Sequence, residues 1–225
     1  MAPEPGETAA VIFDLDGVLL DSETAWIEVK REFTEETGGH WQERAQLDML
    51  GMSSIEWSRY MHDELAVPVP PERISAEVAD RLAQRYREHL PLLPGAVETV
   101  RSMARDWPLA LATSSNRNVI DLVLQKGGLT DAFAVTVSSE EVDRGKPAPD
   151  VYLEAAGRLE VEPAKCVAIE DSTNGIRSAH AAGTTVIAVP NEDFPPESDA
   201  LALAALVLDS LEELTPERVR SLATA

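Results

Sequence analysis

The stretch FDLDGVLLDS, residues 13–22, decides the fold. An apolar run over residues 9–13 predicts a short buried β-strand, and Asp14 and Asp16 follow at its carboxyl end. In a parallel α/β sheet, ligands bind at that end of the strands. Two carboxylates so close together repel each other unless a cation, or a proton shared with a substrate, offsets the repulsion. The stretch therefore indicates a candidate active site.

A calcium-binding loop is the main alternative for this stretch, because Asp and Gly are also common turn residues. An EF-hand needs a third acidic or amide ligand before its glycine and a Glu at the twelfth position. Here Gly17 comes two positions too early, and the apolar residues 18–20 occupy ligand positions. The pattern therefore disfavours an EF-hand.

Further short apolar runs along the chain predict the rest of a sheet. Stretches with helical periodicity separate most of these runs, and strands that alternate with helices are typical of a doubly wound parallel sheet. We therefore expect an α/β fold with a Rossmann-like core. The additional strands are expected at residues 109–113, 134–138, 166–170, 185–189 and 206–208.

One segment interrupts the alternation, because residues 22–90 contain no convincing strand pattern. We expect an all-α cap domain at residues 21–90, inserted into a catalytic core made of residues 1–20 and 91–225. An insertion that begins so near a candidate active site can act as a lid. The alternative for its tryptophans is that they only form the interior of the small helical bundle; they are Trp26, Trp41 and Trp57.

Composition excludes several classes of partner. The chain has 225 residues with 19 basic and 40 acidic side chains, a net charge of −21, which argues against nucleic acid or an anionic membrane as partner. No apolar run approaches the roughly 20 residues that span a bilayer. Residues 1–8 do not resemble a signal peptide. The single cysteine, Cys166, makes a reducing cytoplasm the simplest location. Nothing in the sequence indicates an oligomeric state.

Polar residues also follow the second predicted strand, as Thr113-Ser114-Ser115-Asn116. Hydroxyls and free backbone amides at a helix N-terminus bind phosphate oxygens well. The same residue types are ordinary helix caps, and both interpretations remain open for this segment.

The third predicted strand is followed by Lys146, which two prolines hold in a stiff loop. A lysine fixed beside carboxylates could neutralise them and hold a phosphoryl group, although a lysine in a turn is usually only a surface residue. Glu170 and Asp171 follow the fourth strand, where Asp171 could instead cap a helix. Parallel strands bring these acids to the same sheet edge as the first pair, and hard oxygen ligands without nearby His or Cys fit Mg²⁺.

Four segments in this order resemble the haloacid dehalogenase-like superfamily of aspartate-nucleophile phosphotransferases. The resemblance covers the chain from residue 10 to about residue 215 and points to the branch with a helical cap, which includes β-phosphoglucomutases and many sugar phosphatases. The segments that carry it are DLDGVLLDSE at 14–23, TSSN at 113–116, GKPAPD at 145–150 and IEDS at 169–172.

The resemblance implies a role for each residue of these segments. Asp14 would attack phosphorus and form an aspartyl-phosphate, and Asp16 would protonate the leaving alcohol and then activate water. The phosphoryl group would be held by Lys146, the Thr113 hydroxyl, and the backbone amides of Ser114 and Ser115. Mg²⁺ would be held by the Asp14 carboxylate, the Asp16 carbonyl and Asp171, with Glu170 binding directly or through water.

The choice between phosphatase and mutase depends on the cap. Members that act as β-phosphoglucomutases carry a His where this chain has Trp26, and they flank the cap loop with a Lys and an Arg. The corresponding loop here contains Gly51, Met52 and Ser53 without either basic residue. We therefore expect a phosphatase that acts on a small phosphorylated metabolite, such as a sugar or polyol phosphate.

Two alternatives stay open. A mutase is possible if other cap arginines replace the missing charge, and a non-catalytic protein that binds metal or a partner is the remaining class. Asn116 could contact substrate or only cap a helix. The arginines in question are Arg59, Arg81 and Arg85.

Overall fold

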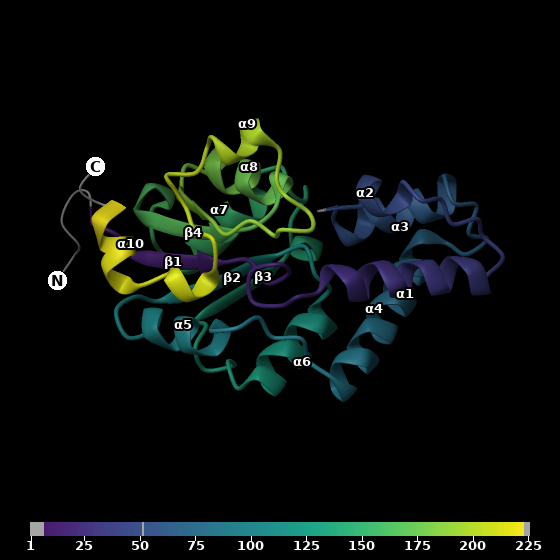
Figure 1. The fold of residues 1–225 in the computed structure, drawn as a ribbon, viewed down its shortest axis with the longest axis horizontal. Helices are drawn as coiled ribbons and strands as arrows, with labels where there is room; N and C mark the ends of the chain where they lie inside the picture. Colours follow the sequence, from purple (N-terminus) through teal and green to yellow (C-terminus); the bar gives the residue numbers. More distant parts are fainter. Residues whose placement is uncertain (1–6, 51, 223–225) are drawn as a thin grey trace.

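The computed structural model describes residues 7–50 and 52–222. Its core is one parallel sheet of six strands in the order β3-β2-β1-β4-β5-β6 (Figure 1). This confirms the predicted α/β fold, and the strands lie within one residue of the predicted runs. They are β1 (Ala10–Phe13), β2 (Leu109–Thr113), β3 (Val135–Ser138), β4 (Cys166–Glu170), β5 (Thr185–Ala188) and β6 (Leu206–Val207).

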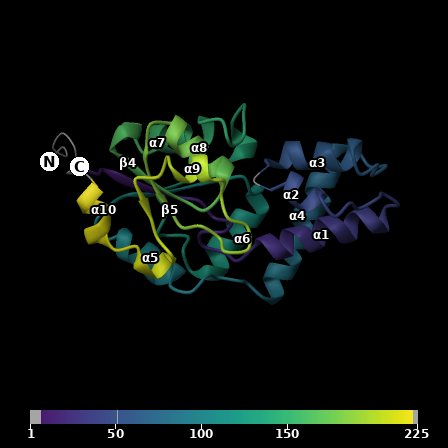
Figure 2. The same cartoon turned by 45° about the horizontal axis from the view of Figure 1, so that its top comes forward.

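Helices cover both faces of the sheet, with α5 and α6 on one side and α7, α8 and α9 on the other (Figures 1 and 2). Alternate side chains of β1 pack on opposite faces of the sheet. Val11 and Phe13 belong to one buried cluster, and Ala10 and Ile12 belong to the second. The strand is apolar throughout because both of its faces are covered. The core helices are α5 (Ala96–Met103), α6 (Arg117–Gly127), α7 (Asp150–Arg158), α8 (Thr173–Ala181), α9 (Ser198–Leu201) and α10 (Pro216–Leu222), with 3-10 turns η1 (Ser139–Glu141), η2 (Pro163–Lys165) and η3 (Leu211–Glu213).

A separate group of helices lies beyond the carboxyl ends of the strands (Figure 1). No strand occurs among the described residues of the segment 21–90, as the sequence pattern suggested. The cap boundaries at residues 20/21 and 90/91 stay a prediction. The helices are α1 (Glu23–Glu36), α2 (Ala45–Asp48), α3 (Ser54–Asp63) and α4 (Pro71–Glu88).

The two chain segments that connect this helical group to the sheet run side by side. The Asp21 amide donates to the Pro91 carbonyl at 2.9 Å, and the Leu93 amide donates to the Leu19 carbonyl at 3.0 Å. The insertion therefore leaves and re-enters the core at one place, beside the end of β1.

The interior of the helical group follows the apolar spacing of α1. Its buried side chains include Trp26, Val29 and Phe33, and the Trp26 ring packs against Trp57 of α3 with ring centroids 6.0 Å apart. Trp41 is only half-buried. Within the described ranges, no helix combines the length and apolar character that crossing a bilayer requires.

Candidate active site

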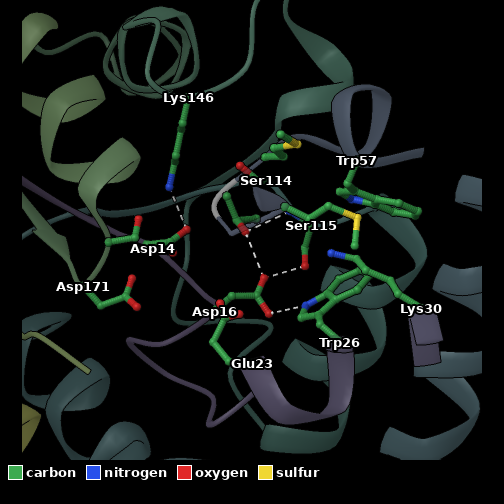
Figure 3. A pocket seen from close by; sticks show the side chains of 14 residues that line it. Asp14, Asp16, Glu23, Trp26, Lys30, Trp57, Ser114, Ser115, Lys146 and Asp171 are labelled. Carbon is green, nitrogen blue, oxygen red and sulfur yellow. Dashed lines mark hydrogen bonds and ion pairs between the residues drawn. The ribbon is translucent and has the colours of Figure 1, made fainter. Parts of the chain in front are cut away.

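The carboxyl end of β1 places Asp14 and Asp16 in a pocket between the sheet and the helical group (Figure 3). About 560 Å³ of space free of protein atoms lies within the pocket and its solvent-filled mouth. Gly17 turns the chain directly after the two acids with a φ of 78°. A Cβ atom at this position would lie 1.9 Å from Asp171 Oδ2, so both backbone conformation and space require glycine here.

Lys146 joins the acids of two strands. Its Nζ lies 2.8 Å from Asp14 Oδ1 and 2.6 Å from Glu170 Oε1, and the residue is 3% exposed. Burial alone would lower the pKa of this ammonium, but the two carboxylates hold the pKa above its usual value. Lys146 is therefore a fixed positive charge between β1 and β4.

Glu170 has hydrogen-bond donors on both carboxylate oxygens. Oε1 accepts from Lys146 and from the Tyr152 hydroxyl at 2.7 Å, while Oε2 accepts from the Asp171 amide at 3.1 Å. Gly175 leaves room for this arrangement, because a Cβ there would lie 1.9 Å from Glu170 Oε2. These contacts fix the position of Glu170 behind Lys146 and Asp171.

The remaining negative charge is not balanced by Lys146 alone. Burial raises the pKa of Asp14 to about 7, with the Glu170 and Asp16 charges adding to the effect against Lys146. Burial likewise raises the pKa of Asp171 well above its usual value, and Glu170 and Asp14 add to the shift. One oxygen of Asp171, Oδ1, is buried without a hydrogen-bond partner.

These acids fit a divalent cation. Asp14, Glu170 and Asp171 each offer an oxygen, and the three oxygens lie within 4.8 Å of one another. An orphaned carboxylate oxygen beside like charges is costly unless a cation binds it, and oxygen-only donors suit Mg²⁺. The Asp16 side chain does not belong to this group; the predicted contribution of Asp16 was its backbone carbonyl.

Asp16 instead contacts the helical group and the residues Thr113-Ser114-Ser115-Asn116, the hydroxyl segment. Its Oδ2 accepts from the Ser115 hydroxyl at 2.6 Å and from the Thr113 hydroxyl at 3.5 Å. Its Oδ1 accepts from Trp26 Nε1 at 2.9 Å. Residues from β1, from the end of β2 and from α1 thus meet at one carboxylate, as Figure 3 shows.

The hydroxyl segment is held in place by the last residue of β3 and the first residue of η1. The Ser138 hydroxyl donates to the Ser115 carbonyl at 2.7 Å, and the Ser139 hydroxyl donates to the Thr113 carbonyl at 3.3 Å. Ser114 lines the pocket, and its buried hydroxyl oxygen has no partner in the structure. An unpaired hydroxyl beside the acids is well placed to bind a ligand oxygen.

Asn116 does not line the pocket. Its side-chain amide donates to Ser75 Oγ of α4 at 3.0 Å and to Glu140 Oε1 at 2.7 Å, which links the helical group to the core. Asn116 precedes α6 but makes no side-chain cap hydrogen bond. The sequence offered no signal for these contacts, because both partners are distant in the chain.

The predicted cap residues separate into three cases. Met52 and Trp26 line the pocket. Ser53 instead caps α3, where its hydroxyl accepts from the Glu56 amide at 3.4 Å. Gly51 lies outside the described residues.

Several pocket residues were not predicted from the sequence. Glu23 and Lys30 of α1 line the pocket, together with Trp57 of α3. The sequence could have indicated Lys30, because it follows Trp26 by four residues and so lies on the same apolar face of α1. Met49 and Ser172 are the other two.

Comparison with known proteins agrees with this geometry. The family model described as haloacid dehalogenase-like hydrolase matches residues 11–189. The chain is 34% identical over 232 residues to hexitol phosphatase B of Escherichia coli (strain K12), which covers 94% of this chain and 96% of that protein.

Two further comparisons show the range of relatives. The chain is 32% identical over 213 residues to the bifunctional riboflavin kinase/FMN phosphatase of Arabidopsis thaliana, with 94% of this chain covered, and it spans 55% of that protein's length. The crystal structure of CbbY from Rhodobacter sphaeroides in complex with phosphate has a TM-score of 0.84 and 27% identity, and the match covers 95% of this chain and 99% of that one.

Proposed function

The chain belongs to the haloacid dehalogenase-like hydrolases, and from this premise we propose that it is a Mg²⁺-dependent phosphatase that hydrolyses a small phosphomonoester through an aspartyl-phosphate on Asp14. The observation that carries the proposal is the buried contact of Lys146 with Asp14, in the same pocket as Asp16 and Asp171. Phosphoryl transfer depends mainly on positioning and charge neutralisation, and this pocket supplies both.

In the first step an Asp14 carboxylate oxygen attacks phosphorus, and the bond from phosphorus to the substrate alcohol breaks. The leaving alcohol takes its proton from Asp16, whose carboxylate is oriented by Ser115 and Trp26. In the second step Asp16 removes a proton from water, the resulting hydroxide attacks phosphorus, and orthophosphate leaves while the Asp14 carboxylate is restored. Two displacements replace one difficult step.

Positive charge is required because the nucleophile and the phosphate are both anionic. Lys146 supplies part of it from the core, and the Ser114 hydroxyl, which lines the pocket without a hydrogen-bond partner among the described residues, is available to a phosphate oxygen. The Ser115 amide, which the family resemblance implies as a further phosphate donor, donates to the Thr113 hydroxyl oxygen at 3.1 Å in this structure. Mg²⁺ would be held by Asp14, Asp171 and the Asp16 carbonyl, with Glu170 behind them, and when bound it would supply Lewis-acid stabilisation of the phosphoryl charge.

We infer a sugar or polyol phosphate as the substrate class. Side chains of α1 and α3 line the pocket opposite the sheet residues, which restricts the size of the alcohol that can be accommodated. A similar protein is named hexitol phosphatase B, which supports the same class. We also propose a cytoplasmic location, because the single cysteine, Cys166, is free and buried.

The test is orthophosphate release from a panel of hexose, pentose and polyol phosphates, with Mg²⁺ and with EDTA. We expect release that requires Mg²⁺ and that Asp14→Asn abolishes. Conversion of a sugar 1-phosphate to an isomer without phosphate release would instead establish the mutase alternative. Binding without turnover of any compound would overturn the proposal.

A further inference from the structure

Lys30 is a buried cation between two indole rings. The residue is 8% exposed, and its Nζ lies 5.2 Å from the Trp26 ring centroid and 4.9 Å from the Trp57 ring centroid. Lys30 lines the pocket that contains Asp14 and Asp16, and Figure 3 shows its amine on the pocket side of the two rings. The rings attract the cation but offer no acceptor for its N–H groups.

The Lys30 ammonium has no hydrogen-bond acceptor or ion pair within the described ranges 7–50 and 52–222. The carboxylate of Glu23, seven residues earlier on α1, likewise has no hydrogen-bond donor and no ion pair among those residues. Burial lowers the pKa of Lys30 to about 8 and raises the pKa of Glu23 to about 7, the mutual charge of the two groups opposing both shifts. The three N–H donors of the buried Lys30 and the carboxylate of the half-buried Glu23 are therefore free to bind a ligand in the pocket that both residues line.

The position of these groups relative to the reacting acids suggests which part of a substrate they meet. In the view of Figure 3, Lys146 lies on one side of Asp16, whereas Lys30 and Trp57 lie on the other. Lys146 contacts Asp14, where phosphorus would bind. Asp16 faces the leaving oxygen, so Lys30 and Glu23 lie farther along the alcohol portion of the substrate.

We propose that Lys30 and Glu23 form a subsite for the hydroxyl groups of the leaving alcohol. The Lys30 ammonium donates to one hydroxyl oxygen, and the Glu23 carboxylate accepts from another. This inference rests on the proposed phosphatase function and specifies its substrate class: an uncharged, hydroxyl-rich alcohol that carries a single phosphate. The indole faces of Trp26 and Trp57 are available to the C–H groups of the same alcohol.

An alcohol with a second anionic group and an alcohol without hydroxyls both fit Lys30 and Glu23 poorly. A second phosphate or a carboxylate at this end of the pocket would meet one cation and the carboxylates of Glu23 and Asp16. A plain hydrocarbon chain would leave the ammonium and the carboxylate unsatisfied. Only a neutral group with both donors and acceptors satisfies Lys30 and Glu23 together.

The first test compares two substrates in Lys30→Met. One is the hexitol, hexose or pentitol phosphate that the wild type hydrolyses best, and the second is n-propyl phosphate, which has the same phosphate and no hydroxyl. We expect kcat/KM for the hydroxylated substrate to fall at least about tenfold more than kcat/KM for n-propyl phosphate, since a hydrogen bond to a charged group is lost. Lys165→Met, at the opposite end of the sheet, is the matched control for loss of one positive charge.

A second variant gives a change of opposite sign, which misfolding cannot produce. Glu23→Gln leaves Lys30 without its compensating charge, so we expect kcat/KM for fructose 1,6-bisphosphate to rise relative to that for the hydroxylated monophosphate. Thermal unfolding followed by circular dichroism verifies that each variant is folded.

Three results would overturn the subsite. They are an equal loss with both substrates in Lys30→Met, no loss with either, or a wild type that does not prefer a hydroxylated monophosphate to n-propyl phosphate. Calorimetric binding in the Asp14→Asn background separates this proposal from the phosphatase function itself. There Lys30→Met is expected to weaken binding of the hydroxylated monophosphate more than binding of inorganic phosphate, whether or not the wild type turns over.

Discussion

Asp16, the proposed general acid, is held by residues of both the core and the helical group. One oxygen accepts from Ser115 of the core, and the second accepts from Trp26 of α1. A general acid must be oriented toward the leaving oxygen, and two fixed donors reduce the freedom of its carboxylate. The core motif supplies Asp16, the proposed general acid, but one of the two donors that orient its carboxylate comes from α1, outside the core.

Trp26→Phe tests that orientation at the level of one hydrogen bond. The change keeps an aromatic ring and removes the N–H that Asp16 accepts. We expect kcat/KM for an alkyl phosphate to fall about tenfold, since a hydrogen bond to a charged group contributes about 1.5–3 kcal/mol. The loss should be smaller for p-nitrophenyl phosphate, whose leaving group needs little acid catalysis.

The control for this change is Trp107→Phe, which removes an indole donor to the Thr8 carbonyl far from the pocket. We expect it to alter thermal stability but not the ratio of the two substrates. Equal losses for both substrates in Trp26→Phe would contradict the orienting role.

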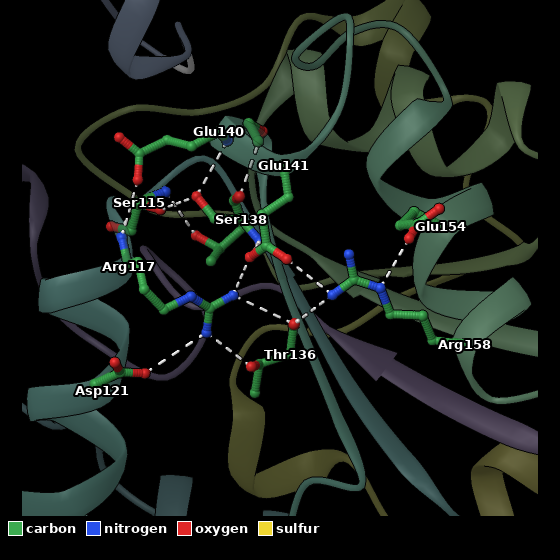
Figure 4. Close-up of polar contacts among 11 residues, drawn as sticks. Ser115, Arg117, Asp121, Thr136, Ser138, Glu140, Glu141, Glu154 and Arg158 are labelled. Carbon is green, nitrogen blue, oxygen red and sulfur yellow. Dashed lines mark hydrogen bonds and ion pairs between the residues drawn. The ribbon is translucent and has the colours of Figure 1, made fainter. Parts of the chain in front are cut away.

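At the level of elements, a polar network around Glu141 lies beside Ser115 of the hydroxyl segment (Figure 4). Glu141 of η1 accepts from Arg117 at the start of α6 and from Arg158 of α7 at 2.8 Å. It also accepts from the Ser138 amide at 3.1 Å. The network connects α6, α7 and the end of β3, where the Ser138 hydroxyl donates to the Ser115 carbonyl at 2.7 Å.

Glu141→Gln should therefore destabilise the fold in a pH-dependent manner. Burial alone would raise the pKa of Glu141, but the hydrogen bonds from Arg117 and Arg158 lower it to about 2 from an ordinary value of 4.5. A lowered carboxyl pKa contributes stability that is fully present above pH 4.5 and is lost as the pH falls through about 2. Because the side chain is partly exposed, we expect a difference from wild type of about 1–2 kcal/mol at pH 7, smaller than the shift alone implies.

Urea unfolding at pH 7 and at pH 3.5 measures this difference, which should shrink at the lower pH. Glu154→Gln is the matched control, because Glu154 pairs with the same Arg158 on the surface. We expect the control to change stability by less than about 0.5 kcal/mol. A difference for Glu141→Gln that does not vary with pH would contradict the assignment.

Gly145, in the loop that carries Lys146, packs closely against Ser53 at the start of α3. A Cβ atom on Gly145 would lie 2.7 Å from Ser53 Cβ, closer than two carbons can approach. We expect Gly145→Ala to hold the two parts apart and to lower kcat/KM about tenfold or more, since misplacement by about 1 Å can cost 10²-fold. Gly157→Ala is the control, because nothing lies within 4 Å of its added Cβ. Unchanged kinetics in Gly145→Ala would mean that the contact is irrelevant to turnover.

The sequence predicted the sheet and the four segments at its edge because short buried strands and the residues after them are local patterns. It did not predict Lys30 as a pocket residue, since a lysine on an apolar helix face is ordinarily expected to reach solvent. Its burial depends on Trp57, which arrives from another helix. The contacts of Asn116 with Ser75 and Glu140 were missed for the same reason: they depend on how the helical group packs on the core.

At the scale of the whole molecule, the net charge of −21 opposes the approach of an anionic substrate. The Debye length shortens from roughly 30 Å at 0.01 M salt to roughly 8 Å at physiological ionic strength, which screens distant charges but not the buried Lys146. We expect kcat/KM to rise about two- to fivefold over that range of ionic strength. Steady-state kinetics in NaCl and in KCl checks this, and a fall with salt in both would contradict it.

In the proposed mechanism the phosphoryl group passes from the substrate to Asp14 and then to water. The most direct measurement is acid quenching of the enzyme during turnover of a ³²P-labelled phosphomonoester, followed by peptide mapping. We predict label on the peptide that contains Asp14, lost on a chase with unlabelled substrate and absent in Asp14→Asn. Turnover that proceeds without label on that peptide, or with label on another residue, would contradict the account.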